Sequence, residues 1–364
     1  MIKIFKFGGA SVKDAAGVRN LVSVVEREGQ LNNLVIVLSA MGKTTNALET
    51  LYSKAFKGEP FEEEMEALRR YHTTIAADLF SPSSEDVISA LDRYFVRLHF
   101  QLLHSPKLNV DLGYDQVISF GEYLSTFLVY SYLKHRGLSI VLKNARFLVR
   151  TDLTWKEGMV NQEETNKAIQ TVLEPLLASH IVLTQGFVGG TKTGFVTTLG
   201  REGSDYTAAI LGNALDAESV TIWKDVPGVL NADPKWMKGA VLLPKLSYQE
   251  ATELTYYGAT VIHPKTIRPL AEKEIPLFVR SFLEPAQPGT RVGMESQKWT
   301  EPAFIVKHNL TLLSFSSKDY SFMDEKNITE VLHLFTKLNL KAHILQVSAT
   351  SISIATELED RALD

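Results

Sequence analysis

The sequence contains no cysteine, which excludes disulfide bonds and thiolate metal ligands. It also lacks an excess of positive charge, because 38 Lys and Arg residues stand against 42 Asp and Glu residues, for a formal net charge of −4. That balance, without any local Lys/Arg run, argues against nucleic acid as a partner. No apolar segment approaches the roughly 20 residues that span a bilayer, and the apolar start is too short for a signal peptide. These absences predict a cytoplasmic protein with no membrane partner.

Apolar runs rich in Val, Ile and Leu alternate along the chain with segments of helical period. Residues 2–7 and Leu34–Leu38 are typical of strands, and the second is apolar at every position, as in a parallel sheet covered on both faces. Between them, residues 18–25 carry apolar side chains at three- and four-residue spacing, typical of one helix face. Further strands are predicted at 138–142, 180–185, 219–223 and 276–279. The alternation predicts an α/β fold with a mainly parallel sheet, and 364 residues suggest two folding units.

Two stretches interrupt this pattern. Residues 59–104 are typical of two or three successive helices, with a capping-box-like Ser83–Asp86 pair, and we interpret them as a helical insertion at one edge of the sheet. Residues 284–302 are rich in Pro, Gly and polar side chains and are typical of a linker. The remaining chain predicts a small α+β module with a strand, a helix and two strands at 311–316, 328–338, 342–348 and 352–356.

Three glycine-containing motifs follow predicted strands or precede a predicted helix. Lys6-Phe7-Gly8-Gly9-Ala10-Ser11 places a cation and two glycines at the carboxyl end of the first strand, where backbone N–H groups can approach an anion. Gly186-Phe187-Val188-Gly189-Gly190 follows the strand at 180–185 in the same way. The alternatives are a strand–helix turn with an exposed lysine for the first motif, and a hairpin turn into Phe195–Thr198 for the second.

The third motif, at residues 199–205, precedes an apolar helix predicted at Tyr206–Leu215. Ser204 or Asp205 is predicted to be the N-cap, and capping alone would explain both residues. Capping does not explain Arg201, whose guanidinium fork can lie beside the positive end of the helix. Together these residues predict a corner that binds a carboxylate.

Other familiar motifs are incomplete. Gly42-Lys43-Thr44 resembles the end of a phosphate-binding P-loop, but position 37, where that motif requires glycine, is Val37 within a predicted strand. The nine histidines show no HExxH or similar ligand spacing, so we expect no protein metal ligands. A nicotinamide dehydrogenase is a third reading of the α/β pattern, but the first strand is not followed by G-x-G-x-x-G.

Taken together, six blocks in a fixed order resemble the aspartate kinases of the amino acid kinase superfamily. These blocks are KFGGASV at 6–12, SAMGKTTN at 39–46, FGE at 120–122, LGREGSDYTAA at 199–209, KDVPGVLNADPK at 224–235 and YGATVIHPKTI at 257–267. The tail after residue 300 is similar to the ACT modules that follow the kinase domain in that family. The resemblance implies an αβα sandwich catalytic domain at 1–290, with an aspartate lobe at about 1–218 and a nucleotide lobe at about 219–290. It also implies a linker at 291–300 and an incomplete ACT region, ferredoxin-like, at 301–364.

The resemblance also implies a role for each matching residue. Lys6 would contact the transferring phosphoryl group beside the backbone of Gly8 and Gly9, and Asp205 would organise the transfer centre. Four residues would hold aspartate, with Arg201 on a carboxylate and Glu122 near the amino group: Thr45, Glu122, Arg201 and Ser204. The nucleotide would lie against Lys224, Asp225, Leu230, Lys235, Thr260 and Val261.

The activity so implied is ATP-dependent phosphorylation of the β-carboxylate of L-aspartate, the first step towards lysine, threonine and methionine. That carboxylate is already ionised at neutral pH, so no general base is required. Catalysis then depends on positioning and on charge neutralisation by lysine, backbone N–H groups and Mg²⁺, which would be held mainly by the phosphates. Because water destroys an acyl phosphate, we expect a closing lid, and the insertion at 59–104 is a candidate.

Several positions depart from the family pattern. Ala10 replaces a hydroxyl residue, Glu202 replaces a common glycine, Leu230 lacks a phenol, and Thr260 lacks a lysine amine found in some relatives. These departures leave two alternatives open: a kinase of glutamate or acetylglutamate, and a non-catalytic amino-acid sensor with a degenerate kinase fold. Activity measured side by side on aspartate, glutamate and acetylglutamate would decide the first alternative. Binding of aspartate or an effector without consumption of ATP would identify the second.

The tail carries a separate expectation. In the family two ACT modules interleave, and a strand at Ala303–Lys307 should belong to the second module. The chain stops at Asp364, soon after the third strand of the first module, so the unit is interpreted as truncated. The resemblance predicts a homodimer and an amino-acid effector, lysine, for the intact protein. Both the ACT-mediated dimer and feedback inhibition are predicted to be impaired in this form.

Overall fold

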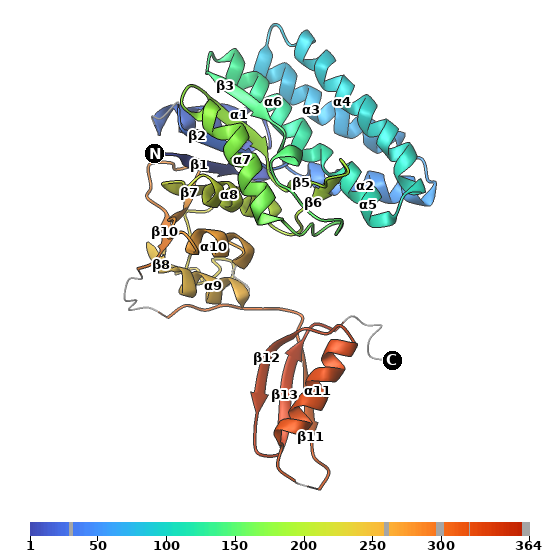
Figure 1. Ribbon diagram of the computed structural model, residues 1–364, viewed down its shortest axis with the longest axis vertical. Helices are drawn as coiled ribbons and strands as arrows, with labels where there is room; N and C mark the ends of the chain where they lie inside the picture. Colours follow the sequence, from blue (N-terminus) through green and yellow to red (C-terminus); the bar gives the residue numbers. More distant parts are fainter. Residues whose placement is uncertain (29–31, 258–261, 296–301, 320, 359–364) are drawn as a thin grey trace. The chain divides into compact units, whose positions relative to one another are not determined.

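The structure is a computed structural model, and it describes residues 1–28, 32–257, 262–295, 302–319 and 321–358. The chain divides into two compact units. Among the described residues, the larger contains Met1–Tyr256, 262–295 and Pro302, and the smaller contains Tyr257 and the residues from Ala303 onward. Each unit is described by itself below (Figure 1).

The larger unit is built on an eight-stranded sheet, with the strand order β3-β4-β2-β1-β7-β9-β10-β8. The first six strands in that order are mutually parallel, and β10 is antiparallel to β9. The strands are β1 (Lys3–Phe7), β2 (Leu34–Leu38), β3 (Ile140–Lys143), β4 (Ile181–Gln185), β7 (Ser219–Lys224), β8 (Lys245–Ser247), β9 (Leu277–Ser281) and β10 (Thr290–Gly293). The predicted α/β class with a mainly parallel sheet is therefore confirmed.

Both faces of the sheet are buried, and the side chains of β2 show why. Leu34, Ile36 and Leu38 belong to one apolar cluster, whereas Val35 and Val37 belong to the other. Successive side chains of a strand point to opposite faces, so a run that is apolar at every position needs helices on both sides. The first cluster is covered by α1 (Ala15–Arg27), α2 (Thr44–Lys57), α3 (Glu62–Phe80), α4 (Glu85–His104) and α6 (Phe120–His135). The second is covered by α7 (Gln162–Leu177), α8 (Gly203–Ala214), α9 (Tyr248–Tyr256) and α10 (Pro264–Ala271) (Figure 1).

The helical insertion is present as α3 and α4, followed by α5 (Val110–Ile118). The predicted capping pair Ser83–Asp86 is wrong, because α4 begins at Glu85 and its N-cap, Ser84, makes no side-chain capping hydrogen bond. The prediction of an aperiodic linker over 284–302 is also wrong at residues 290–293, which form β10 between β9 and β8. A short antiparallel hairpin of β5 (Val188–Gly190) and β6 (Val196–Thr198) follows β4.

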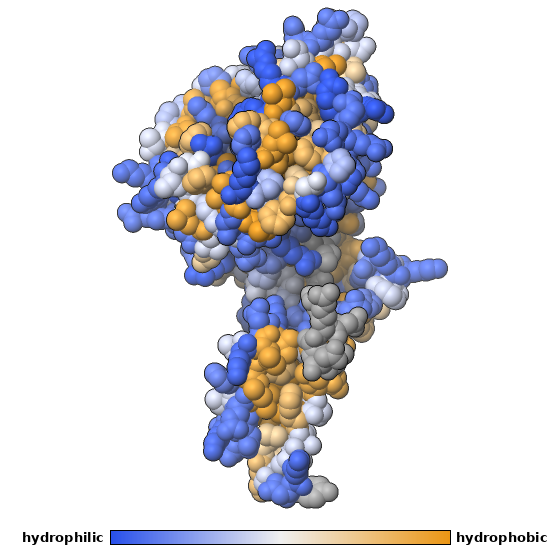
Figure 2. Space-filling view, turned by 90° about the vertical axis from the view of Figure 1, so that its right-hand side faces the viewer, coloured by the Kyte–Doolittle hydropathy of each residue, from blue (hydrophilic) through white to orange (hydrophobic). Residues whose placement is uncertain are grey.

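The smaller unit has three antiparallel strands in the order β11-β13-β12, with one helix packed on them. Its elements are β11 (Thr311–Ser316), α11 (Glu325–Lys337), β12 (Ala342–Val347) and β13 (Ser351–Thr356). Phe335, Ile352 and Ile354 form its buried core. Ala303–Lys307 is not a strand, so that prediction is wrong. Several large apolar side chains of this unit are exposed, as the hydrophobic surface in Figure 2 shows.

Across the described ranges of both units, no helix combines the length and apolar character that crossing a membrane requires.

Candidate active site

An open cavity of about 750 Å³ lies where β1, β2 and β4 end in the larger unit. In the strand order, β1 has β2 on one side and β7 on the other, so the chain changes direction across the sheet at β1. Ligands of open parallel sheets bind at the carboxyl ends of strands beside such a point. The cavity is lined by Lys6, Gly9, Ser39, Ala40, Gly42, Thr45, Glu49, Tyr114, Glu122, Lys156, Glu157, Phe187, Thr198, Gly200, Arg201, Glu202, Gly203 and Ser204.

Two lysines meet one carboxylate next to this cavity, which Lys6 lines and Lys224 and Asp205 do not. Lys6 Nζ, on β1, lies 2.5 Å from Asp205 Oδ1, and Lys224 Nζ, at the end of β7, lies 3.3 Å from Asp205 Oδ2. Lys6 is 5% exposed and Asp205 is fully buried. Burial would raise the pKa of Asp205, but the charges of Lys6 and Lys224 outweigh it and lower that pKa. Asp205 therefore stays ionised and holds the two amines side by side.

Glycine is required at two close approaches beside the cavity. A Cβ on Gly9 would lie 2.6 Å from the carbonyl oxygen of Ala40, and a Cβ on Gly186 would lie 2.5 Å from the Cβ of Ser204. The predicted motif at residues 186–190 is thus both a hairpin, through β5, and a close contact with the first turn of α8. Gly8 lies beside the amine of Lys6, since a Cβ there would be 3.6 Å from Lys6 Nζ.

Glu122, on α6, is a buried acid whose carboxylate borders the cavity. Its Oε1 accepts a hydrogen bond from the Ala40 N–H at 3.2 Å, while Oε2 has no hydrogen-bond partner among the described residues. Burial raises the pKa of Glu122 to about 8, against the opposing effects of the Ala40 N–H and Lys6. A cationic group placed against Oε2 would satisfy this oxygen and favour the ionised form.

The four residues predicted to hold aspartate, Thr45, Glu122, Arg201 and Ser204, all line this one cavity together with Lys6. Arg201 is exposed and has no ion pair within the part of the chain that the structure describes. The predicted N-cap at Ser204 or Asp205 is wrong: α8 begins at Gly203, and the N-cap is Glu202 in a left-handed conformation with φ 55°. Ser204 and Asp205 consequently lie in the first helical turn, where the helix dipole favours negative charge.

Glu202 brings a second carboxylate close to the lysines. Its Oε2 lies 3.8 Å from Lys224 Nζ. Burial raises the pKa of Glu202, Lys224 opposes that shift, and the neighbouring Asp205 adds to it. The acid therefore shares Lys224 with Asp205 and borders the same cavity.

Residues that support another wall of the cavity were not predicted from the sequence. Asp115, on α5, is fully buried and accepts hydrogen bonds from the backbone N–H groups of Lys156 and Thr198 and from the Thr198 hydroxyl. Burial raises the pKa of Asp115 to about 6, although these three donors oppose the shift. A buried acid bound by distant loops has no local sequence pattern, and only its position beside the FGE block could have drawn attention to it.

The predicted nucleotide residues are not all brought together. Lys224 joins the Lys6–Asp205 pair, and Asp225 follows it directly, exposed. Leu230 and Lys235 lie on the loop after β7 and do not line the cavity, and Lys235 is exposed. Thr260 and Val261 lie outside the described residues.

A sequence profile described as the amino acid kinase family matches residues 1–281. Lysine-sensitive aspartokinase 3 of Escherichia coli (strain K12) is 31% identical over 362 residues, which cover 98% of this chain and 78% of that protein. Chloroplastic aspartokinase 1 of Arabidopsis thaliana is 32% identical over 377 residues, and this chain spans 63% of its length. The crystal structure of E. coli aspartokinase III in complex with aspartate and ADP matches with a TM-score of 0.84 and 30% identity, covering 99% of this chain and 79% of that one.

Proposed function

Because the chain belongs to the amino acid kinase family and, within it, to the aspartokinases, we propose that it transfers the terminal phosphoryl group of ATP to the β-carboxylate of L-aspartate. The product is 4-phospho-L-aspartate. The observation that carries the proposal is that Lys6, suited to a phosphate, and Arg201, suited to a carboxylate, open into one cavity. Lys6 and Arg201 in separate cavities would have argued against it.

The chemistry needs positioning more than proton transfer. A carboxylate oxygen of aspartate attacks the γ-phosphorus, a P–O bond forms, and the bond to the ADP oxygen breaks, so no proton moves. The obstacle is repulsion between two anions, and cations at the point of transfer remove it. Lys6 and Lys224 supply those cations, and Asp205 fixes their positions before either substrate binds.

Recognition of aspartate is assigned to the other wall. Arg201 is exposed and unpaired within the described residues, so its guanidinium is available to a substrate carboxylate. Glu122 offers an oxygen without a partner for the α-ammonium group, and Thr45 and Ser204 border the same space. This division leaves the β-carboxylate free to face Lys6.

The same proposal includes Mg²⁺ as the companion of ATP, a cytoplasmic location and, for the intact protein, a homodimer and lysine as an effector. Asp205 is occupied by two lysines, and the described residues contain no group of three or more acidic or histidine side chains that could hold a metal. Mg²⁺ would therefore be held mainly by phosphate and water. The name of the lysine-sensitive relative supports the effector, and the exposed apolar side chains of the smaller unit support the homodimer.

The test is ATP-dependent acyl-phosphate formation, trapped with hydroxylamine, with aspartate, glutamate and acetylglutamate measured in parallel. We expect hydroxamate from aspartate and, at equal concentration, at least tenfold less from the other two acids, because a polar site rejects a poorly fitting analogue strongly. Preference for glutamate or acetylglutamate would change the assigned substrate. Aspartate binding by calorimetry without any hydroxamate would instead identify an amino-acid sensor.

A further inference from the structure

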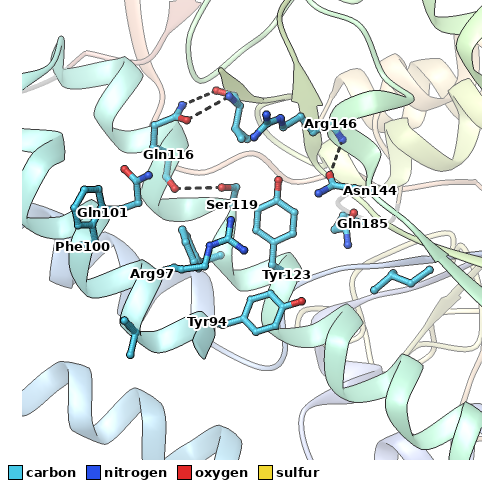
Figure 3. Close-up of a pocket in the computed structure, with 14 residues that line it drawn as sticks. Tyr94, Arg97, Phe100, Gln101, Gln116, Ser119, Tyr123, Asn144, Arg146 and Gln185 are labelled. Carbon is cyan, nitrogen blue, oxygen red and sulfur yellow. Dashed lines mark hydrogen bonds between the residues drawn. The ribbon is translucent and has the colours of Figure 1, made fainter. Parts of the chain in front are cut away.

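A second cavity in the larger unit, of about 530 Å³, is not used by the proposed reaction (Figure 3). It lies among α4, α5, α6, β3, β4 and β6. Its walls are formed by Tyr94, Val96, Arg97, Phe100, Gln101, Gln116, Ser119, Phe120, Tyr123, Leu142, Asn144, Arg146, Gln185 and Val196. The volume falls within the range of small-molecule sites in proteins.

The charge of this second cavity has one sign. Arg97 and Arg146 both line it, whereas no acidic residue does. Within the described residues neither guanidinium has a carboxylate partner, and Arg146 Nε is buried without a hydrogen-bond acceptor. A buried donor without a partner is costly, and an anion in the cavity would satisfy it.

Arg97 and Arg146 lie on either side of one tyrosine hydroxyl in this cavity (Figure 3). Both guanidinium groups line the cavity together with the phenol of Tyr123. Burial raises the pKa of Tyr123 to about 12, and Glu122 adds to that shift, while Arg146, Asn144 and Arg97 oppose it. In the view of Figure 3, the Tyr123 hydroxyl points into the cavity between Arg97 and Arg146. The stem of Arg146 is held in place, because a Cβ on Gly190 would lie 2.7 Å from Arg146 Cγ.

Two amide side chains of the wall, Gln116 and Gln185, are each held by hydrogen bonds at both the oxygen and the nitrogen. Gln116 donates to the Val196 carbonyl at 2.8 Å and accepts from the Val196 N–H at 3.3 Å. Gln185 accepts from the Ala145 N–H at 2.9 Å and donates to the Thr126 hydroxyl at 2.8 Å. The remaining walls are mostly aromatic or aliphatic, as in sites that bind an apolar body with a few polar anchors.

We propose that this second cavity is a binding site for a small organic anion that carries one or two carboxylates on an apolar body. The carboxylates lie against Arg97 and Arg146, and the apolar body packs among Phe100, Tyr94 and Leu142. Guanidinium forks suit planar carboxylates, and the aromatic walls suit a ring or a branched chain.

The two cavities share structural elements, so a ligand in one can affect the other. Tyr123 is the neighbour of Glu122 on α6, and Gln116 is the neighbour of Asp115 on α5. Tyr123 and Gln116 line the second cavity. Their neighbours serve the substrate cavity: Glu122 lines it, and Asp115 binds the backbone of Lys156 and Thr198, which also line it. We therefore expect occupancy to change aspartate affinity, a step that rests on the proposed function.

To test this, the whole chain is titrated with phenylsuccinate by calorimetry. Phenylacetamide, which has the ring but no charge, and succinate, which has the two carboxylates but no ring, are the control ligands. We expect a phenylsuccinate Kd on the order of 1 mM or tighter, and weaker binding of both controls. Arg97→Gln and Arg146→Gln should each weaken phenylsuccinate about tenfold or more, because each removes a charged hydrogen bond. Arg93→Gln, an exposed arginine of α4 outside the cavity, is the matched control and should leave the Kd unchanged.

Three results would overturn the site: no phenylsuccinate binding at 10 mM, equal binding of phenylacetamide, or binding that is lost in Arg201→Ala but kept in both cavity variants. The last would place the probe in the substrate cavity. Aspartate Kd measured with saturating phenylsuccinate should change at least twofold, and an unchanged value would remove the coupling. Because probe binding is measured without turnover, the site can stand even if the protein fails to phosphorylate aspartate.

Discussion

The two sides of the proposed substrate cavity differ in whether their charged groups are paired with other protein groups. On the side that we assign to phosphate, here called the phosphate side, Lys6 and Lys224 are joined to Asp205 by ion pairs of 2.5 and 3.3 Å. On the side that we assign to the amino acid, Arg201 has no ion pair among the described residues, and one oxygen of Glu122 has no hydrogen-bond partner there. The charges of the phosphate side are therefore paired with one another, whereas the polar groups of the other side are available to bind a ligand.

The difference follows from what each side has to do. Charges that stabilise a transferring phosphoryl group act best when they are fixed in advance, because no reorganisation is then needed during the reaction. Charges that select a substrate should be unsatisfied until the right ligand arrives, since an analogue that leaves them unpaired is then rejected. Changes on the first side should reduce turnover, and changes on the second should reduce affinity.

The largest expected effect comes from the phosphate side. Lys6→Met removes a cation from the transfer point but keeps much of the side-chain volume, and we expect kcat to fall by about 10³-fold or more. The aspartate KM should change less than about fivefold, because Arg201 and Glu122, the proposed recognition groups, are both retained. Steady-state kinetics with hydroxylamine trapping would measure both constants.

Lys3→Met is the matched control for Lys6→Met. Lys3 lies on the same strand and does not line the cavity, so its replacement should leave kcat within about twofold. The thermal stability of both variants should be measured as well, because the loss of Lys6 leaves the buried Asp205 with Lys224 as its one cationic partner among the described residues. A folded Lys6→Met protein with near-normal kcat would remove the distinction between the two sides.

Arg201 tests the open side. Arg201→Ala should raise the aspartate KM about 10- to 100-fold, the loss expected for a charged hydrogen bond, with kcat within about threefold. Arg268→Ala, an exposed arginine of α10 outside the cavity, should change neither constant. If Arg201→Ala lowered kcat without changing KM, the guanidinium would belong to the phosphate side instead.

Glu122 should make aspartate binding depend on pH. Burial raises its pKa to about 8, so at pH 7 the Glu122 carboxyl is mostly protonated and must lose a proton to pair with the α-ammonium group. The aspartate KM should therefore fall about tenfold between pH 7 and pH 9, where the carboxylate is already ionised. In Glu122→Gln, the KM should be higher and this part of the pH profile should be flat. An unchanged slope in that variant would assign the pH dependence to another group.

The sequence predicted best those features that depend on local pattern. Leu34–Leu38 was predicted with its observed bounds, because a strand buried on both faces is apolar at every position. Lys6 and Arg201 were predicted to share a site because their motifs resemble those of one family, and they line one cavity. By contrast, β8 and β10 were missed, since each has only three or four residues and β10 lies in a stretch rich in Pro and Gly.

Contacts between distant segments were beyond the reach of local pattern. Asp115 binds backbone N–H groups 41 and 83 residues away, and the amine of Lys224 meets Asp205 from a different element. The cavity at Arg97 and Arg146 likewise joins α4 to a short helical turn near β3. The same reasoning explains the N-cap error: Ser204 and Asp205 are favourable caps locally, but their contacts with Gly186 and Lys6 place them inside the helix.

The smallest expected effect lies at Glu202, where the two sides meet. Its carboxylate competes with phosphate for Lys224, so Glu202→Gly should lower the KM for ATP about two- to fivefold, as expected for a partly screened charge. Glycine also suits φ 55°, and the free energy of unfolding should rise by up to about 1 kcal/mol. Glu202→Gln separates the causes, because it removes the charge but keeps a side chain in the left-handed conformation. It should reproduce the change in the KM for ATP without the gain in stability. A higher KM for ATP in both variants would instead mean that Glu202 helps to bind the nucleotide and belongs to the phosphate side.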